Sequence, residues 1–414
     1  MKRAFTFLIL LLAIVANGAV YTSTNATWAS VNWVETNKIQ SGDFLHIPRA
    51  DANGAYWPQR INILVPQTIY GDGSNSATGT CITNMQAFTT DTPGDNPLFT
   101  VQPNVDGFVT ISNLFLQDSN QTSIGINSGY GNAVCPTRVR ICYVTFSGFR
   151  FAVWFTELFG VVDHCIFLDN RIIRSTQFGN AGGSWLGQFV GSMGPPWPMN
   201  TTNAIFFEDD IIVEDANLQI PYIAFDTEIP STYIVRHSLY NENMPGTYLD
   251  NNDMHGDSVN SGYSNPTNAV GLKIYDNIFN FVSIANGGSR IANIRGGVGA
   301  MVYSNTVLQN GTVDLAIQTN PSNGDPPTNA YIFANYDVNT LIPVEQLDGM
   351  TTLGKNFFTN APSGGFSAYE APYPHWLVAL SQNSSVNTNG MLALNAGNGK
   401  FTIGSGNETM TLNH

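Results

Sequence analysis

One short pattern of apolar and polar residues returns seven times between residues 111 and 307. Each copy is six residues long, begins with an apolar residue and ends with an aromatic or aliphatic one. The copies are ISNLFL (111–116), ICYVTF (141–146), VDHCIF (162–167), FEDDII (207–212), VRHSLY (235–240), IYDNIF (274–279) and VYSNTV (302–307). Irregular repeats of this kind are typical of chains in which each unit buries its apolar face only against its neighbours.

We predict that each copy is a short strand, a bend and the start of a second strand. The first and last positions then point inward and form two apolar columns. The bend positions form a third column, in which polar side chains can build an internal hydrogen-bonded ladder; its members are Leu114, Val144, Cys165, Asp210, Ser238, Asn277 and Asn305. The pairs Asp163-His164, Glu208-Asp209 and Arg236-His237 should share one stacking position.

These columns predict an all-β fold, a right-handed single-stranded parallel β-helix (a solenoid) with terminal caps. The alternatives are a β-propeller and a jelly roll. The shortest interval between copies is 21 residues, whereas a propeller blade needs roughly 40–50. Beyond the N-terminal apolar segment, no capped segment with helical periodicity is expected.

The N-terminus resembles a secretory signal, because Lys2 and Arg3 precede an apolar run that ends in small residues. That run is too short to cross a bilayer, which needs roughly 20 residues, and no other segment is long and apolar enough. We therefore predict a signal peptide over 1–18 and no membrane span. The protein should be secreted and extracellular, or else periplasmic or held at a cell surface.

The rest of the chain divides into an N-terminal cap (19–41), the parallel β-helix (42–376) and a strand-rich C-terminal cap (377–414). In the last segment, MLALNAG and KFTIGS are candidate strands of a hairpin. Four cysteines, an even number in an exported chain, permit two disulfides.

The net charge of the chain limits the kinds of partner that it can bind. The chain has 16 Lys and Arg against 30 Asp and Glu, a formal net charge of -14. A non-specific nucleic-acid binder needs a basic surface, so we expect no nucleic-acid partner. Only 11% of residues are charged, which suits stacked coils, because like charges repeated on neighbouring strands repel.

Several segments resemble secreted bacterial β-helix proteins of the pectate-lyase-like superfamily. They include GDFLHIPRADANGAYWPQRINI near the first coil, VVDHCIF, YIVRHSLY and LKIYDNIF in the middle, and PYPHW (372–376). The resemblance spans roughly residues 40–376 and implies the β-helix fold more strongly than it implies a reaction.

Two motifs are similar to those of pectate lyases themselves. Asp163-His164 matches an Asp-His pair of that family, and RIANIRGG (290–297) matches its Arg-x-Pro-x-x-Arg-Gly-Gly element with Ala292 in place of proline. The resemblance implies that Arg290 is the Brønsted base and that Arg295 binds the substrate carboxylate. Those enzymes also place a lysine about two coils earlier, and the matching region of this chain, 226–228, has none.

Other residues are candidates for a site, each with a purely structural alternative. Calcium could be held by carboxylates, its usual ligands, and the candidates are Glu208, Asp209, Asp253 and Asp257. Candidates for binding a polysaccharide are Lys273, His255 and two tryptophans of a Gly/Pro-rich insertion, Trp185 and Trp197. The alternatives are turn stabilisation, stacking, loop solvation and loop packing.

Three functions follow. The first is a polysaccharide lyase that carries out β-elimination on a uronate-containing polysaccharide, with calcium as its cofactor. The second is a non-catalytic extracellular or cell-surface β-helix that binds carbohydrate or is structural. The third is a glycoside hydrolase that uses carboxylates near Glu208 to Asp210, since a pair of carboxyl groups is the usual requirement of that reaction.

Overall fold

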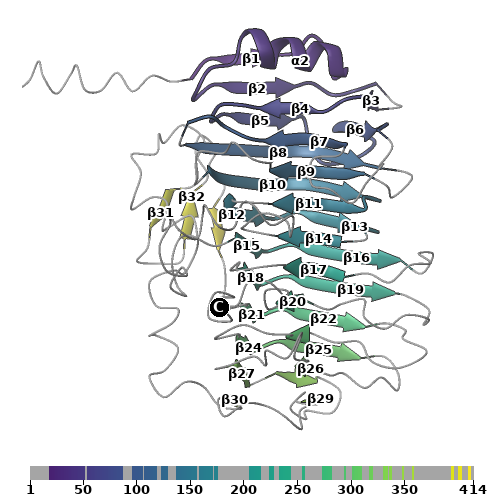
Figure 1. Cartoon of the computed structure of the whole chain (residues 1–414), viewed down its shortest axis with the longest axis vertical. Coiled ribbons are helices and arrows are strands. Elements are labelled where there is room, and N and C mark those ends of the chain that lie inside the picture. The colour runs from purple at the N-terminus through teal and green to yellow at the C-terminus, as the bar shows by residue number, and fades with distance from the viewer. Residues whose placement is uncertain are drawn as a thin grey trace, which may run out of the picture.

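The structure, a computed structural model, is built from strands that stack in parallel along one long axis (Figure 1). It describes residues 18–51, 54–86, 96–105, 107–118, 123–128, 137–155, 158–170, 172–175, 205–215, 223–227, 233–243, 254–256, 273–281, 293–294, 301–309, 317–319, 330–333, 335–337, 347–348, 357–358, 393–395, 400–402 and 409–411. The proposed signal peptide lies almost entirely outside these residues.

A sheet of 20 strands forms two of the three strand series. The first series is β1 (Val20–Thr22), β2 (Phe44–Ile47), β5 (Thr68–Gly71), β8 (Phe108–Gln117), β10 (Thr137–Ser147), β12 (Leu158–Asp163), β15 (Ile205–Glu208), β18 (Tyr233–Arg236), β21 (Lys273–Tyr275), β24 (Met301–Tyr303), β27 (Ala330–Phe333) and β30 (Phe357–Phe358). The second is β3 (Ala55–Trp57), β6 (Thr80–Asn84), the far halves of β8 and β10, β13 (Ile166–Leu168), β16 (Ile211–Asp215), β19 (Leu239–Asn243), β22 (Ile278–Phe281), β25 (Thr306–Gln309) and β28 (Tyr336–Asp337).

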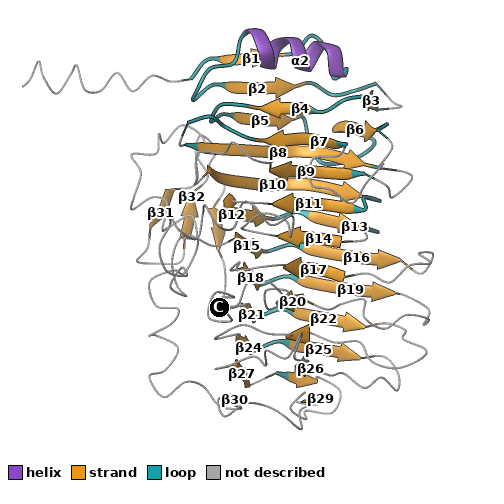
Figure 2. Ribbon diagram, in the orientation of Figure 1, coloured by secondary structure: helices purple, strands orange, loops and turns teal. Residues whose placement is uncertain are grey.

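A sheet of ten strands forms the third series. It contains β4 (Ile61–Ile63), β7 (Pro97–Val101), β9 (Ile124–Ser128), β11 (Phe151–Phe155), β14 (Ile172–Ser175), β17 (Ile223–Thr227), β20 (Met254–Gly256), β23 (Asn293–Ile294), β26 (Ile317–Thr319) and β29 (Leu347–Asp348). From β2 to β29, each turn of the chain adds one strand to each series, and Figure 2 shows the strands as stacked layers. The chain therefore has an all-β, parallel β-helix fold.

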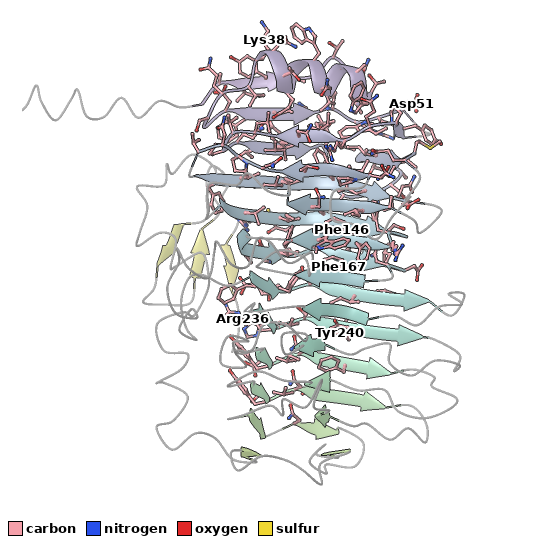
Figure 3. The ribbon with its side chains drawn as sticks, in the orientation of Figure 1. Lys38, Asp51, Phe146, Phe167, Arg236 and Tyr240 are labelled. Atoms are coloured by element: carbon pink, nitrogen blue, oxygen red, sulfur yellow. The ribbon has the colours of Figure 1, made fainter. Side chains whose placement is uncertain are left out.

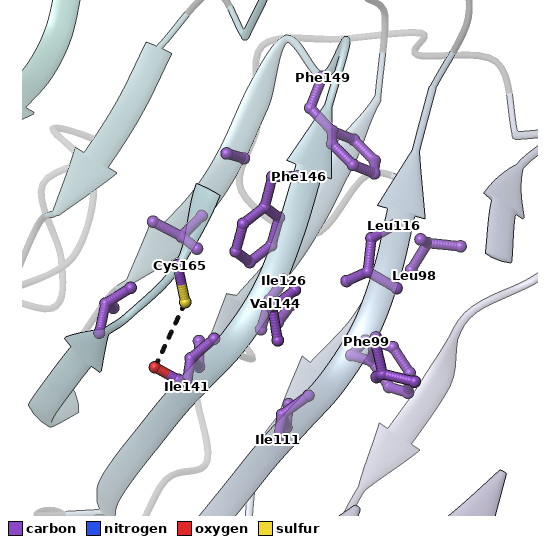
Figure 4. Packing of buried hydrophobic residues seen from close by; sticks show 14 of the residues in the cluster. Leu98, Phe99, Ile111, Leu116, Ile126, Ile141, Val144, Phe146, Phe149 and Cys165 are labelled. Atoms are coloured by element: carbon purple, nitrogen blue, oxygen red, sulfur yellow. Dashed lines mark hydrogen bonds between the residues drawn. The ribbon is translucent and has the colours of Figure 1, made fainter. Parts of the chain in front are cut away.

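The two predicted apolar columns are confirmed. Ile141 of β10 pairs with Val162 of β12, Val162 pairs with Phe207 of β15, and all three side chains are fully buried. In the second column Phe146 stacks on Phe167 with ring centroids 5.1 Å apart, and Tyr240 stacks on Phe279 at 4.9 Å (Figures 3 and 4). Stacking of like side chains from coil to coil thus builds the buried interior.

The predicted bend column is also confirmed, and it contains a hydrogen-bonded ladder. Asn277 Nδ2 donates to Asn305 Oδ1 on the next coil, 3.0 Å away, and Asn305 Nδ2 donates to Asn335 Oδ1 at 2.9 Å. Each of these amide groups also donates to a backbone carbonyl, that of Val235 for Asn277 and that of Ile274 for Asn305. Asn335 is a further rung that the sequence pattern did not include.

The residue type in the bend column changes along the stack of coils, from apolar to polar. Leu114 and Val144 occupy its first positions and are buried apolar side chains. Cys165 follows, with its Sγ 3.6 Å from the carbonyl oxygen of Ile141 (Figure 4). Asp210 comes next; its Oδ1 accepts a bond from the backbone N–H of Cys165 at 2.7 Å.

The residue before each ladder position has a left-handed backbone. These residues have φ between 53° and 58° and are Asn113, Tyr143, His164, Asp209, His237, Asp276 and Ser304. A left-handed residue makes the sharp bend that turns the chain from the first series to the second. Asn, Asp and His tolerate this conformation better than most non-glycine residues, although Tyr143 adopts it too.

One helix, α2 (Trp28–Asn37), corrects the expectation that no helix follows the N-terminal segment. Thr27 precedes it without a side-chain capping bond, so the usual sequence signal of a helix start is weak. Val31 and Val34 are buried against the first strands, and Trp57 Nε1 donates to the carbonyl of Ala26 at 2.8 Å. Contact with the apolar interior therefore stabilises a helix that its own sequence hardly specifies.

At the other end of the chain, β31 (Ala393–Asn395) pairs antiparallel with β32 (Lys400–Thr402), as predicted for a hairpin. A third strand, β33 (Thr409–Thr411), pairs antiparallel with β32. The described cysteines, Cys81, Cys142 and Cys165, are free thiols. The two disulfides that four cysteines permit therefore do not form among the described residues.

Candidate functional site

Charged side chains occupy a row on the outer side of the first strand series. In this row Asp163 pairs in register with Glu208, Glu208 with Arg236, and Arg236 with Tyr275. The predicted shared stacking position is thus confirmed. All four side chains are buried, so their charges must be compensated by one another rather than by water.

In the first group of paired charges, Asp163 binds Arg140 of the preceding coil and so joins two coils. Arg140 donates to both carboxylate oxygens, Nε to Oδ1 at 2.9 Å and Nη2 to Oδ2 at 2.8 Å. His164 Nδ1 lies 3.0 Å from the same Oδ2. Burial acts to raise the pKa of Asp163, but the charge and hydrogen bonds of Arg140 outweigh it and hold the pKa below its usual range.

His164 is the exposed end of this group, with 30% of its side chain accessible. Burial acts to lower its pKa, yet the bond to Asp163 more than offsets this and raises the pKa above its usual value. The ring also lies against Tyr143 of the preceding coil, with ring centroids 5.0 Å apart. Asp163 thus orients the imidazole through Nδ1, as in other carboxylate–histidine pairs.

The second compensated group is buried more completely. Arg236 Nε donates to Glu208 Oε2 at 2.7 Å, Nη2 forms an ion pair with the same oxygen at 2.6 Å, and Nη1 donates to the hydroxyl of Tyr275 at 2.7 Å. The guanidinium also lies over the ring of Phe206, 5.1 Å from its centroid. Arg236 is labelled in Figure 3. The Glu208 carboxylate is therefore held by Arg236.

The three consecutive acids 208–210 do not converge on one point. Glu208 is bound to Arg236, Asp209 is the left-handed bend residue, and Asp210 lies in the core ladder. Burial raises the pKa of Asp210 well above its usual value. Within the described ranges no group of three or more His, Cys, Asp or Glu is placed to hold a metal ion.

One predicted site residue, His255, lies in the ten-stranded sheet. His255 of β20 pairs with Asp226 of β17 on one side and with Asn293 of β23 on the other. Asn293 lies between Arg290 and Arg295 in the sequence. The fold thus places the backbone of His255 directly beside that of Asn293, although the two residues are 38 apart in the sequence.

Lys273 lies elsewhere, in β21 of the first series, where it pairs with Ile234 and Met301. The other predicted site residues fall outside the described residues: Arg290, Arg295, Trp185, Trp197, Asp253 and Asp257. Three residues of the polar groups above were not among the candidates: Arg140, Tyr143 and Tyr275. The alignment of the copies was the available signal for two of them, because it places Tyr143 in the same column as His164 and Tyr275 in the same column as Asp163.

Among the described residues no helix is long and apolar enough to cross a membrane.

The fold and the rows of side chains define an all-β protein with a parallel β-helix. No family model matches the chain, and no curated protein matches it. It is similar to the structure of an alginate lyase from Paenibacillus sp. strain FPU-7, with 12% identity, a TM-score of 0.42, and 83% of this chain and 98% of that one covered. It is also similar to DFA-IIIase from Arthrobacter chlorophenolicus A6 without its lid, in complex with GF2, with 10% identity, a TM-score of 0.46, and 84% and 96% covered.

Proposed function

We propose that this chain is a secreted polysaccharide lyase with a right-handed β-helix, and that it carries out β-elimination on a uronate-containing polysaccharide. The observation that supports this most is the pairing of His255 with Asn293, a residue that lies between Arg290 and Arg295 in the sequence. The site would lie on the ten-stranded sheet around β17, β20 and β23.

In the proposed reaction, Arg290 removes the proton from the sugar carbon beside the carboxyl group. The electron pair forms a carbon–carbon double bond, the glycosidic carbon–oxygen bond breaks, and the leaving sugar oxygen takes up a proton. A guanidinium has a pKa above 12, so Arg290 needs a positive environment to act as a base. Arg295, five residues further along the chain, would supply that charge and bind the uronate carboxylate.

The other roles are assigned by their nearness to this segment. His255 would bind a sugar hydroxyl beside Asn293, and Trp185 and Trp197 would be platforms for sugar rings. Asp253 and Asp257, on either side of β20 in the sequence, would hold calcium, which neutralises a uronate carboxylate when bound. Glu208 has no place in this set because it is bound to Arg236.

The same ion pair weighs against a glycoside hydrolase centred on residues 208–210. That reaction needs two carboxyl groups that reach the substrate. Glu208 and Asp210 each have 1% of their surface exposed, so neither can reach a sugar.

A carbohydrate-binding protein without catalysis is the second candidate. It is favoured by the way the described structure uses its cations, since Arg140 and Arg236 are both occupied by buried carboxylates. A chain with net charge -14 also repels a polyuronate at long range.

One experiment separates the two. The purified chain is incubated with a panel of polyuronates and neutral polysaccharides, with calcium and with a chelator, and the ultraviolet absorbance of unsaturated product is followed. A lyase produces absorbance with at least one polyuronate. Retention on a polysaccharide column without product from any polymer would establish the binding protein instead.

A further inference from the structure

A row of polar and aromatic residues crosses the ten-stranded sheet, with one residue from each coil. From β11 to β26 its members are Trp154, Arg174, Asp226, His255, Asn293 and Gln318, and each pairs in register with the next. Figure 1 shows β11, β14 and β17 as successive arrows of one layer. The row thus runs through the strands of the proposed site and reaches Arg174, on the coil before them.

The alternation of residues along the strands places this row on the outer face of the sheet. Val153 and Phe155, on either side of Trp154, belong to the buried core, whereas Trp154 packs with Phe151 outside it. Successive residues of a strand lie on opposite faces, so Arg174, which pairs with Trp154, shares the outer face. Trp154 is itself buried, so a site on this row begins at Arg174.

Arg174 is the one lysine or arginine in the described strands of this sheet. Two arginines of the first strand series, Arg140 and Arg236, are bound to buried carboxylates instead. Because the net charge of -14 repels a polyuronate at long range, a chain that binds one needs a cation at the site itself. The register supplies that cation on the coil next to Asp226.

We propose that Arg174 binds the carboxylate of a uronate unit in a subsite next to the unit held at His255 and Asn293, and so makes the site selective for polyuronates. This role rests on the proposed function for the place and the substrate class of the site, but it does not depend on a reaction there. A guanidinium presents a planar fork of N–H donors that matches the two oxygens of a carboxylate. A neutral sugar unit has no charged acceptor for this fork, so it binds there more weakly.

Asp226, the neighbour of Arg174 in the row, is a competing carboxylate. A guanidinium has five N–H donors, so a single carboxylate does not use all of them. Arg236 is an example in the described structure, because it binds Glu208 through Nε and Nη2 while its Nη1 donates to the hydroxyl of Tyr275. An ion pair with Asp226 is therefore compatible with substrate binding by Arg174.

The test compares a polyuronate with the same polymer after its carboxyl groups have been reduced to alcohols, which removes the charge and keeps the linkages. Binding of the full chain to immobilised polygalacturonate, alginate and their reduced forms is measured in the cold, where cleavage is slow. We expect wild type to bind at least one polyuronate more tightly than its reduced form. Arg174→Gln should weaken binding of that polyuronate about 10- to 100-fold and leave binding of the reduced form unchanged.

Two further variants keep the test sharp. Arg174→Lys retains the charge without the fork, so it should weaken binding of the polyuronate by a smaller factor, and it replaces Arg174→Gln if that variant does not fold. The matched control is Arg60→Gln, which removes the same charge at an exposed position outside the row and should keep wild-type affinities. Circular dichroism checks that all variants are folded.

Equal affinity of wild type for both forms of each polymer, or Arg174 variants that keep the wild-type preference, would overturn this role. Loss of stability with an unchanged preference would assign Arg174 to an ion pair with Asp226 alone. The proposed lyase is tested separately, by unsaturated product. A preference that depends on Arg174 without any product would overturn the lyase and leave the role of Arg174 standing, whereas product together with an unchanged preference in Arg174→Gln would do the reverse.

Discussion

Asn277 Nδ2 donates to Asn305 Oδ1 at 3.0 Å, although 28 residues separate them in the sequence. The same Nδ2 donates to the carbonyl of Val235, and Asn277 Oδ1 accepts from the backbone N–H of Ser238. One side chain thus satisfies buried polar groups on the coil before its own and on the coil after it. The ladder links coils whose loops differ greatly in length.

Replacing Asn277 should therefore destabilise the fold. Asn277→Ala leaves the carbonyl of Val235 and the N–H of Ser238 buried without partners, and each such group costs about 1–3 kcal/mol. We expect a lower thermal midpoint and a lower free energy of unfolding by chemical denaturant. Asn62→Ala, at an exposed position of β4, is the control and should change stability little. Equal effects of the two substitutions would show that the ladder contributes nothing.

Asp210→Asn should have the opposite effect. Asp210 Oδ2 is buried and has no hydrogen-bond partner, whereas an asparagine can donate from this position as Asn277 and Asn305 do. We expect the variant to be more stable at neutral pH by about 1–3 kcal/mol.

The gain should depend on pH. Burial raises the pKa of Asp210 in the folded state, so its contribution is most favourable below the pKa of the unfolded chain and is lost as the pH rises. The stabilisation by Asp210→Asn should thus be smallest near pH 4 and grow toward neutrality. A variant that melts below wild type at neutral pH would contradict this interpretation.

Glu35 of α2 should make the N-terminal coils sensitive to pH. Burial raises its pKa from 4.5 to about 7, with the bond from Gln67 Nε2 acting in the opposite direction. Because the folded state holds the proton more tightly, the contribution of Glu35 is full below about pH 4.5 and is lost as the pH rises through 7.

We therefore expect the thermal midpoint of wild type to fall between pH 5 and pH 8 more than that of Glu35→Gln. Hydrogen exchange of α2 amides locates the effect. The exposed Asp51→Asn variant is the control and should follow wild type (Asp51 is labelled in Figure 3). Parallel pH profiles for wild type and Glu35→Gln would rule out this role.

Breaking the pair between Glu208 and Arg236 should destabilise the protein strongly. Removing one member of a buried ion pair leaves an uncompensated charge and costs about 3–5 kcal/mol. We expect this for Glu208→Gln in thermal and denaturant unfolding. Glu208→Leu combined with Arg236→Met should recover much of the loss, because both charges are then gone. If Glu208→Gln instead kept its stability and lost calcium affinity, Glu208 would be a metal ligand and not a structural residue.

The sequence was sufficient to predict which side chains fill the interior. It was insufficient to predict most of the site. The inward columns and the ladder follow from residue types that recur at a fixed place, so aligning the copies predicted Val162, Tyr240 and Asn305 correctly. Asn335 was missed because the last position of its copy holds the charged Asp337 in place of an apolar residue. Helix α2 was missed because packing on the first coil, not capping or periodicity, stabilises it.

The groups of buried charged residues were harder to predict from the sequence, because which residues meet depends on which coils are adjacent. Arg140 meets Asp163 across one coil, and Arg236 meets Glu208 across another, at separations of 23 and 28 residues. Once the copies are aligned, the register shows which residues share a row, but not which carboxylate binds which cation. The pairing of His255 with Asn293 was hidden for the same reason, since a long insertion separates their strands.

The most direct test of the proposed function compares Arg290→Ala with wild type on the polyuronate that gives product. Removing a group that transfers a proton in the transition state typically costs about 10²–10⁴ in rate. We predict a loss of kcat of that size, measured by the absorbance of unsaturated product, while the control Arg60→Ala at an exposed position keeps wild-type activity. Full activity in a folded Arg290→Ala variant would contradict the assignment of Arg290 as the base.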